Sequence, residues 1–536
     1  MKILANRFSG TYQKEILLNI IRGLGVKECV NIVPEPFKIN DDEGRGCKFQ
    51  HVFAYDVNAA RYTQTDFNSL IPVDEALLKR MSFTECEIIR MLEKDIPSHT
   101  YFDQNEYPRD VIDPHVQFRI NKYMLGSVVT MDYEERHRIY YRHVRFWNDF
   151  FTRNKIDFFV ASYYPHYIYE YVAFRLAEIH RVPTVIASYT RVNQHCQIYN
   201  TIEENNPDIR QRYEQLLKTE KPENVKLNKY FQFEWDRMSA EEDKQTLPWY
   251  FNLEERKEIE EKAKDFYKER ELAEESRKIN TLRYQKKKDL KWLKNAIMRR
   301  VDVDFLYYRL KIGNAVKFVK RFQDYYESLC GVPDFKARYV YVPLHMQPEA
   351  TTAPVGGAYA DQSLMIQMLS YYLPEGWFLY VKENPWQKNK HRSVHFYQDL
   401  CNNPRVKLIS KKVSTFQLQK YSVATATITG SAGLEGLFKN KPCLSFGYHY
   451  YMHAPGVFNI RTNEECKNAL LKIHEGVNID KGELLLFFKA LQDCTVEASL
   501  SFENLVQSEY TYDENIKRLA EAYVSNIKKL LKLHDQ

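Results

Sequence analysis

The sequence predicts an α/β protein made of two doubly wound parallel sheets with a charged helical segment between them. Short apolar strands alternate with amphipathic helices in residues 1–195 and again in 336–500. Parallel sheets require this alternation, because each strand must be followed by a crossover. Residues 196–335 are instead rich in charged residues and good helix formers, which indicates a helical insertion. With 536 residues the chain is too long for one ordinary core.

In the first segment, apolar runs and helical periodicity mark the elements in order. Strands are expected at 2–8, 29–33, 51–55, 156–162 and 183–188. Helices are expected at 12–25, over most of 74–150 and at 164–181. The helix at 12–25 ends at a glycine, which is a common stop signal.

The same alternation returns after residue 336. Strands are expected at 337–344, 377–383, 406–410, 424–430 and 442–446. Helices are expected at 361–373, 395–402, 415–422 and 432–440. Residues 501–536 form a separate tail whose periodicity predicts an amphipathic helix.

Composition and charge exclude several classes of protein. A formal charge of only +6 excludes a strongly basic nucleic-acid coat, so no nucleic-acid partner is expected. Nine scattered cysteines argue against a disulfide framework or zinc site and favour a cytoplasmic protein. There is no apolar run long enough to span a membrane. The basic helix at 286–300 could dock on the anionic inner face of the cell membrane, although a solvated arm explains the same pattern.

Polar clusters follow four successive strands of the second sheet, and ligands of open parallel sheets bind outside the carboxyl ends of the strands. The side chains of the first cluster are expected to lie on one face of a strand, before a loop in which paired glycines allow a turn. The last cluster begins a helix whose N-terminus is suited to bind an anion. Purely structural roles explain the same residues: a histidine of the core, caps of helices, an ordinary polar loop, and close packing of a helix on the sheet. The candidate residues are His345, Gln347 and Glu349; Lys382, Asn384 and Arg392; Ser414 and Thr415; and Gly430, Ser431 and Glu435.

The first domain supplies a second set of candidates. His166 and Glu170 stand four residues apart after the strand at 156–162 and could orient or deprotonate an acceptor hydroxyl. Arg191 follows the strand at 183–188 and is expected to face the cleft. The alternative is that His166 and Glu170 are an ordinary pair of residues on the protein surface. No metal site is expected, because the Asp302-Val303-Asp304 pattern follows a basic helix instead of a strand.

The motifs VPLHMQPEATTAPVGG, LPEGWFLYVKENP and TGSAGLEGLF, with the Ser414-Thr415 pair, resemble the capsule polysaccharide biosynthesis proteins. That family includes the bacterial β-Kdo transferases and is similar in motif order to bacterial sialyltransferases. The resemblance implies that Asn384-Pro385 and Ser414-Thr415 bind a CMP-sugar, and that Glu349 is the nucleophile of a retaining mechanism. Asn384 stands where the family usually has histidine; asparagine can donate to phosphate but carries no charge.

Together these patterns predict a GT-B-like glycosyltransferase of bacterial surface polysaccharide, with two Rossmann-like domains. Residues 1–195 would bind a glycan or glycolipid acceptor, and 336–500 a nucleotide-sugar donor, with CMP-linked Kdo or another nonulosonic acid favoured and no further cofactor. One alternative is a polyol-phosphate transferase that uses a CDP-alditol and a histidine base. Another is a non-catalytic scaffold of capsule assembly, which Asn384 keeps open.

Overall fold

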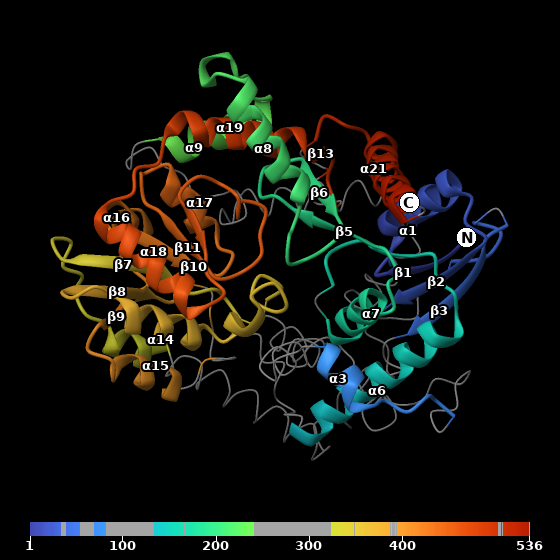
Figure 1. Ribbon diagram of the computed structural model, residues 1–536, viewed down its shortest axis with the longest axis horizontal. Coiled ribbons are helices and arrows are strands. Elements are labelled where there is room, and N and C mark those ends of the chain that lie inside the picture. The colour runs from blue at the N-terminus through green and yellow to red at the C-terminus, as the bar shows by residue number, and fades with distance from the viewer. Residues whose placement is uncertain are drawn as a thin grey trace, which may run out of the picture.

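The structure is a computed structural model that describes residues 1–33, 39–44, 46–53, 69–81, 133–165, 167–240, 323–347, 349–385, 387, 392, 394–501, 505 and 508–534. Within these residues the chain forms two sheets, one in each half of the molecule (Figure 1). His166, the basic helix at 286–300 and Asp302-Val303-Asp304 lie outside the described residues.

The first sheet has the strand order β3-β2-β1-β4-β5-β6-β13. Its strands are β1 (Lys2–Asn6), β2 (Glu28–Val33), β3 (Lys48–Phe53), β4 (Phe158–Ala161), β5 (Thr184–Tyr189), β6 (His195–Tyr199) and β13 (Val496–Glu497). Neighbours are parallel from β3 to β5, whereas β6 and β13 add antiparallel strands at one edge. From β1 the chain adds β2 and β3 on one side, and it then returns to add β4 and β5 on the other side. The carboxyl ends of β1 and β4 therefore form a topological switch point.

Helices cover both faces of this sheet because its strands are buried on both sides. Leu4 points into the core beneath α6 (Tyr133–Arg153) and α7 (Ile168–Ile179), next to the short α3 (Glu75–Met81). Its neighbours Ile3 and Ala5 point the other way, into the core beneath α1 (Thr11–Leu24) and α21 (Tyr512–His534). The tail at 501–536 therefore contributes a helix to the first sheet's core.

The second sheet is wholly parallel and has the order β9-β8-β7-β10-β11-β12. Its strands are β7 (Arg338–Pro343), β8 (Trp377–Lys382), β9 (Val406–Ile409), β10 (Ala424–Thr427), β11 (Cys443–Ser445) and β12 (Val457–Asn459). The order again places a switch point between two central strands, here β7 and β10.

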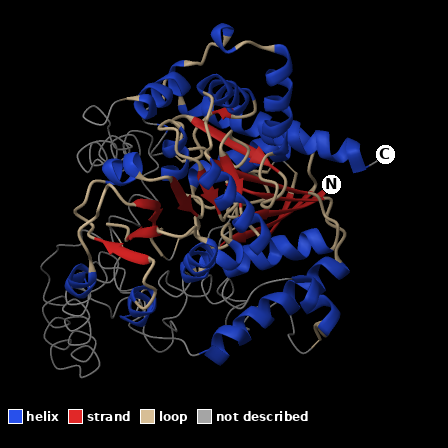
Figure 2. Ribbon diagram, turned by 60° about the vertical axis from the view of Figure 1, so that its left-hand side comes forward, coloured by secondary structure: helices blue, strands red, loops and turns tan. Residues whose placement is uncertain are grey.

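One face of the second sheet packs on α14 (Gln362–Tyr372), α15 (Val394–Cys401) and α18 (Asn463–Glu475). The other packs on α16 (Thr415–Tyr421), α17 (Ser431–Leu437) and α19 (Lys481–Asp493). Figure 2 shows the strands inside and the helices around them. The predicted fold class, α/β with two doubly wound Rossmann-like sheets, is confirmed.

The segment expected as a charged insertion begins with ordered elements. β6 extends the first sheet, and α8 (Pro207–Thr219) and α9 (Lys229–Ser239) pack against α19, with the single turn η2 (Pro222–Asn224) between them. Trp235 of α9 contacts Phe438 and Phe488 edge-on. These elements lie along the top of Figure 1, where they connect the two halves. Residues 241–322 lie outside the described part.

Candidate active site

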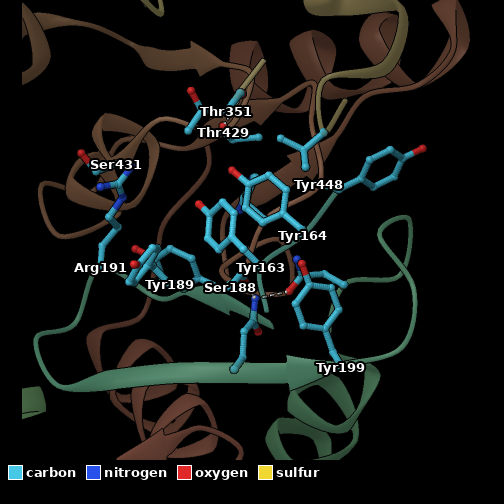
Figure 3. A pocket seen from close by; sticks show the side chains of 15 residues that line it. Tyr163, Tyr164, Ser188, Tyr189, Arg191, Tyr199, Thr351, Thr429, Ser431 and Tyr448 are labelled. Atoms are coloured by element: carbon cyan, nitrogen blue, oxygen red, sulfur yellow. Dashed lines mark hydrogen bonds between the residues drawn. The ribbon is translucent and has the colours of Figure 1, made fainter. Parts of the chain in front are cut away.

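The two switch points face each other across one cavity, which we call the interdomain cavity (Figure 3). Tyr163 and Tyr164 come to it from just beyond β4, at the first sheet's switch point. Thr429 and Ser431 come from just beyond β10, at the second sheet's switch point. Each sheet thus presents its usual ligand-binding edge to the same space.

Tyrosines dominate the walls of the interdomain cavity. Tyr163 and Tyr164 pack with their ring centroids 4.2 Å apart, and burial raises the pKa of both phenols, so both hydroxyls stay protonated and can donate hydrogen bonds. The full set is Tyr163, Tyr164, Tyr189, Tyr199, Tyr448 and Tyr450. These residues were not predicted from the sequence, although SYYP directly follows β4 and GYHYY begins two residues after the end of β11. Tyrosine clusters at the carboxyl ends of strands were the available signal.

A buried polar group forms the part of the wall that belongs to the first domain. The Nε2 of Gln197 donates to Ser188 Oγ at 3.0 Å and to Asn205 Oδ1 at 2.9 Å. The Oε1 of Gln197 has no hydrogen-bond partner among the described residues, nor has Nδ1 of the buried His449 on the opposite wall. The walls therefore keep hydrogen-bonding capacity in addition to their aromatic surface.

Arg191 lies at the cavity as expected. It follows β5 with a left-handed backbone (φ 65°), is exposed, and points across the cavity toward Ser431 (Figure 3). Among the described residues that line the cavity none is acidic. The cavity is therefore suited to an anionic ligand.

The expectation that His345, Gln347 and Glu349 share a strand face is wrong. β7 ends at Pro343, so these residues lie in the loop beyond it, where side chains do not alternate as in a strand. The loop continues into the second sheet's first helical turn, η5 (Gly357–Ala360).

His345 connects the two strands of the second switch point. Its Nε2 lies 2.9 Å from Thr427 Oγ1 and accepts a hydrogen bond from the Thr429 N–H at 3.3 Å. Burial, with the charges of Arg392 and Arg191, lowers the pKa of His345 to about 4, so the imidazole is neutral at pH 7. A β-carbon on Gly430 would lie 2.7 Å from Thr427 Oγ1, which explains why glycine stands there.

Arg392 and Gln347 belong to a buried network. Arg392 Nε donates to Glu383 Oε2 at 2.8 Å, with the two side chains 1% and 0% exposed. Its Nη atoms donate to Gln347 Oε1 and, at 2.9 Å, to the His345 carbonyl. The network fixes the loop beyond β7 against the loop beyond β8, so Arg392 acts here as a clamp.

The second and third clusters lie side by side. Lys382 Nζ donates to the Val413 carbonyl at 2.6 Å and to Thr415 Oγ1 at 2.9 Å, and burial lowers its pKa to about 8. Ser414 Oγ accepts from the Gln417 N–H at 3.3 Å, so Ser414 is the N-cap of α16, one of its two predicted alternatives. Asn384 is half-buried at the end of β8, and its N–H donates to Glu383 Oε1.

Glu349 stands beside the interdomain cavity. Its Oε2 accepts from Thr351 Oγ1 at 2.8 Å, and Thr351 lines the cavity. The loop that follows Glu349 is packed between the domains, because Ala353 and Val355 lie in the core beneath α6 and α7. The paired glycines let this loop turn tightly, because a β-carbon on Gly356 would lie 2.5 Å from the Thr352 carbonyl and Gly357 has a left-handed backbone (φ 52°).

Two other predicted carboxylates are paired with arginines. Glu435 is buried, and its Oε1 lies 3.8 Å from Arg237 Nη2 of α9. Glu170 is fully buried, and its Oε1 lies 3.8 Å from Arg7 Nη1 at the first switch point. Its Oε2 also accepts from the Tyr167 N–H at 3.3 Å in a capping box, so Glu170 has a structural role in α7.

Of the predicted residues, Arg191 and Ser431 line the interdomain cavity, and His345 is bonded to its lining residue Thr429. Within the described residues, no cluster of three His, Cys, Asp or Glu side chains is placed to hold a metal ion. None of the described helices combines the length and the apolar character needed to cross a membrane.

No family model and no curated protein matches the chain. Solved structures that resemble it include KpsC, a β-Kdo 2,7 transferase from Thermosulfurimonas dismutans, at 14% identity and TM-score 0.23, over 39% of this chain and 61% of that one. The UDP-GlcNAc 2-epimerase from Methanocaldococcus jannaschii is similar at 11% identity and TM-score 0.24, over 90% of this chain and 94% of that one. The structure of this epimerase in complex with UDP-GlcNAc and UDP is similar at 11% identity and TM-score 0.23, over 75% of this chain and 93% of that one. Likenesses this distant carry no functional argument, so the site itself has to supply one.

Proposed function

We propose that this protein is a glycosyltransferase of bacterial surface polysaccharide synthesis, which transfers Kdo or another nonulosonic acid from a CMP-activated donor. The observation that carries the proposal is the meeting of two switch points at the interdomain cavity. Transfer needs a donor and an acceptor in contact, and two Rossmann-like edges that face each other supply one binding surface for each.

The charge of the cavity supports an anionic donor. Arg191 crosses it, and no acidic residue lines it among those described. A CMP-nonulosonic acid carries a phosphate and a sugar carboxylate, and arginine binds both groups with paired hydrogen bonds. In this proposal Arg191 binds the donor's phosphate at the interdomain cavity. Lys382, Asn384 and the Ser414-Thr415 turn, which lie outside its lining, hold the rest of the nucleotide, and Arg392 shapes their loops.

Glu349 is the proposed nucleophile. Its carboxylate would attack the anomeric carbon and release CMP. The acceptor hydroxyl would then displace the Glu349 carboxylate and lose its proton to solvent water, so two displacements retain the anomeric configuration. The Thr351 hydroxyl holds this carboxylate beside the cavity. Neutral His345 would serve as a hydrogen-bonding group near it, since its lowered pKa opposes a role as an acid at neutral pH.

The first test is nucleotide binding, measured as thermal stabilisation by CMP, CDP, UDP and GDP. CMP should stabilise the protein by about 2.7 kcal/mol at a hundred times its dissociation constant. Arg191→Gln should weaken CMP binding at least about tenfold, because a charge-assisted contact to phosphate is lost. Arg181→Gln is the matched control, because Arg181 is also exposed with a left-handed backbone (φ 59°) but precedes β5 instead of following it.

Several outcomes would contradict the proposal. Equal CMP binding by the parent and Arg191→Gln would exclude the interdomain cavity as the site of the donor's phosphate. Turnover of CDP-glycerol or CDP-ribitol in place of a CMP-sugar would identify a polyol-phosphate transferase. CMP-sugar binding without transfer to fragments of the host's surface polysaccharide would indicate a scaffold.

A further inference from the structure

We infer that the acceptor is a chain of at least two sugars, and that a second cavity binds the sugar next to the one that reacts. This outer cavity lies between residues 189–195 and 498–501. It shares Tyr189 and Arg191 with the interdomain cavity, so the two are adjacent. The inference rests on the proposed function, because it describes the acceptor of that reaction.

The size of the outer cavity suits a sugar ring. Its volume is about 220 Å³, whereas the interdomain cavity, at about 70 Å³, has room for the reacting groups and not for a whole sugar nucleotide. Pockets for drug-sized ligands have roughly 300–1,000 Å³, so this one is of the right order for a single ring.

The wall at residues 189–195 is the turn between β5 and β6, and hydrogen bonds hold it in place. Thr190 Oγ1 donates to the His195 carbonyl at 2.9 Å and accepts from the Val192 N–H at 3.3 Å. Arg191 and Gln194 have left-handed backbones (φ 65° and 57°), which bend the turn around the cavity. The turn is therefore shaped before any ligand binds.

The wall at 498–501 is the segment through which the chain leaves β13 for α21, and helices of the first domain fix it. The Ser499 N–H donates to Asn515 Oδ1 at 2.8 Å, and the Tyr12 hydroxyl donates to the Ser499 carbonyl at 2.5 Å. Gln13 Nε2 donates to the Leu500 carbonyl at 2.9 Å. Ser499 Oγ also donates to Gln194 Oε1, which joins the two walls. A pre-formed site binds without a large cost of ordering its walls.

The chemistry of the lining is that of a sugar site. Asn193, Gln194 and Ser501 place amide and hydroxyl groups in the lining, where Gln194 Nε2 donates to Asn193 Oδ1 at 3.2 Å. A sugar hydroxyl that enters the cavity would join or exchange with such bonds, because amides and hydroxyls both donate and accept. Tyr189 adds an aromatic wall between the two cavities. His195 is neutral, because burial lowers its pKa to about 4, and no acidic residue is among the described lining residues. A polyhydroxylated ring that continues from the interdomain cavity fits this lining.

The test measures binding of acceptor fragments of increasing length by isothermal titration. The probes are fragments of one, two, three and four sugars, prepared by mild hydrolysis of the host's own surface polysaccharide and separated by size. The parent should bind the two-sugar fragment about tenfold more tightly than the single sugar, which corresponds to about 1.4 kcal/mol. Ser501→Trp should remove this gain, because a half-buried lining residue becomes large enough to fill the outer cavity.

Ser501→Ala is the matched variant, because it removes one hydroxyl but leaves the outer cavity open, and it should keep most of the gain with length. CMP stabilisation should be equal in the parent and both variants, which shows that Ser501→Trp folds and that the donor site is intact. Binding by the parent without any gain from one sugar to two would overturn the inference, and so would an equal gain in Ser501→Trp. If affinity rises from one sugar to two but no nucleotide binds, the outer cavity is a sugar site and the proposed function is overturned instead.

Discussion

Replacement of Arg392 by methionine distinguishes a structural arginine from a phosphate ligand. Its guanidinium is 2.8 Å from Glu383 Oε2, and both side chains are almost wholly buried. Removal of one partner of a buried ion pair leaves the other charge unpaired and typically costs 3–5 kcal/mol. We therefore expect Arg392→Met to lower the free energy of unfolding by about 4 kcal/mol.

The contacts around the pair act in both directions and keep the estimate near the middle of that range. Arg392→Met also removes the donors to the His345 carbonyl and to Gln347 Oε1, at about 0.5–1.5 kcal/mol each. Glu383 keeps two donors, the Tyr397 hydroxyl at 2.7 Å and the Asn384 N–H at 2.8 Å, which limit the cost. A solvent-facing phosphate ligand would instead give little loss of stability and a large loss of nucleotide affinity.

Urea unfolding followed by circular dichroism measures the effect as a shift in the transition midpoint. Lys517→Met is the control, because Lys517 pairs with Glu521 at 3.9 Å on the surface of α21, with both side chains more than half exposed. Such pairs contribute about 1 kcal/mol or less. Adding Glu383→Leu to Arg392→Met should restore part of the lost stability, because no charge is left buried. The structural role of Arg392 would be refuted if Arg392→Met and Lys517→Met unfold at the same urea concentration and Arg392→Met no longer binds CMP.

Three further predictions concern Glu349, His345 and Gly430 of the second domain. Glu349→Gln should abolish transfer and leave CMP binding intact, and mass spectrometry should detect a sugar adduct on the parent alone; an inverted product would exclude the nucleophile. The folded-state pKa of His345, about 4, is below its ordinary 6.5, so its contribution to stability is present above pH 6.5 and is lost as the pH falls toward 4. His345→Gln should therefore reduce the acid sensitivity of unfolding by up to about 3 kcal/mol, and an unchanged pH profile would contradict this. Gly430→Ala should cost about 1–3 kcal/mol because its β-carbon would overlap Thr427, whereas Gly331→Ala, with open space around it, should be neutral in the same urea assay.

The fold was predictable because its signals are local. Each strand expected in the first and third segments has a counterpart, since apolar strands and amphipathic helices alternate in both. β6 pairs with the neighbouring β5, with Tyr189 opposite Cys196, and was missed because it lies where the charged insertion was expected to begin. The short β12 at the edge of the second sheet was also missed. β13 was missed because its partner β6 lies about 300 residues earlier, with Val496 opposite Cys196, and no local pattern encodes such a partner. The packing of α21 on the first sheet was missed for the same reason.

The site was predictable only in part. Sequence position placed Ser431 and Arg191 at strand ends, and the fold brings both to one cavity. It could not show that Arg392 is paired with Glu383, because the same basic residue at a loop suits a phosphate or a buried carboxylate equally. The tyrosines of the cavity were missed because tyrosine after a strand is also an ordinary core residue.

The position of α21 has a consequence for how the protein is made. Ile516, Leu519 and Tyr523 of this helix complete the core beneath β1 and β4, so one face of the first sheet has only α1 as a cover while the ribosome translates the second domain. The first domain thus finishes folding after the second has been translated. Until residue 523 has left the ribosomal tunnel, the apolar surface that α21 covers on α1 and this face stays open, which is the kind of surface that chaperones bind.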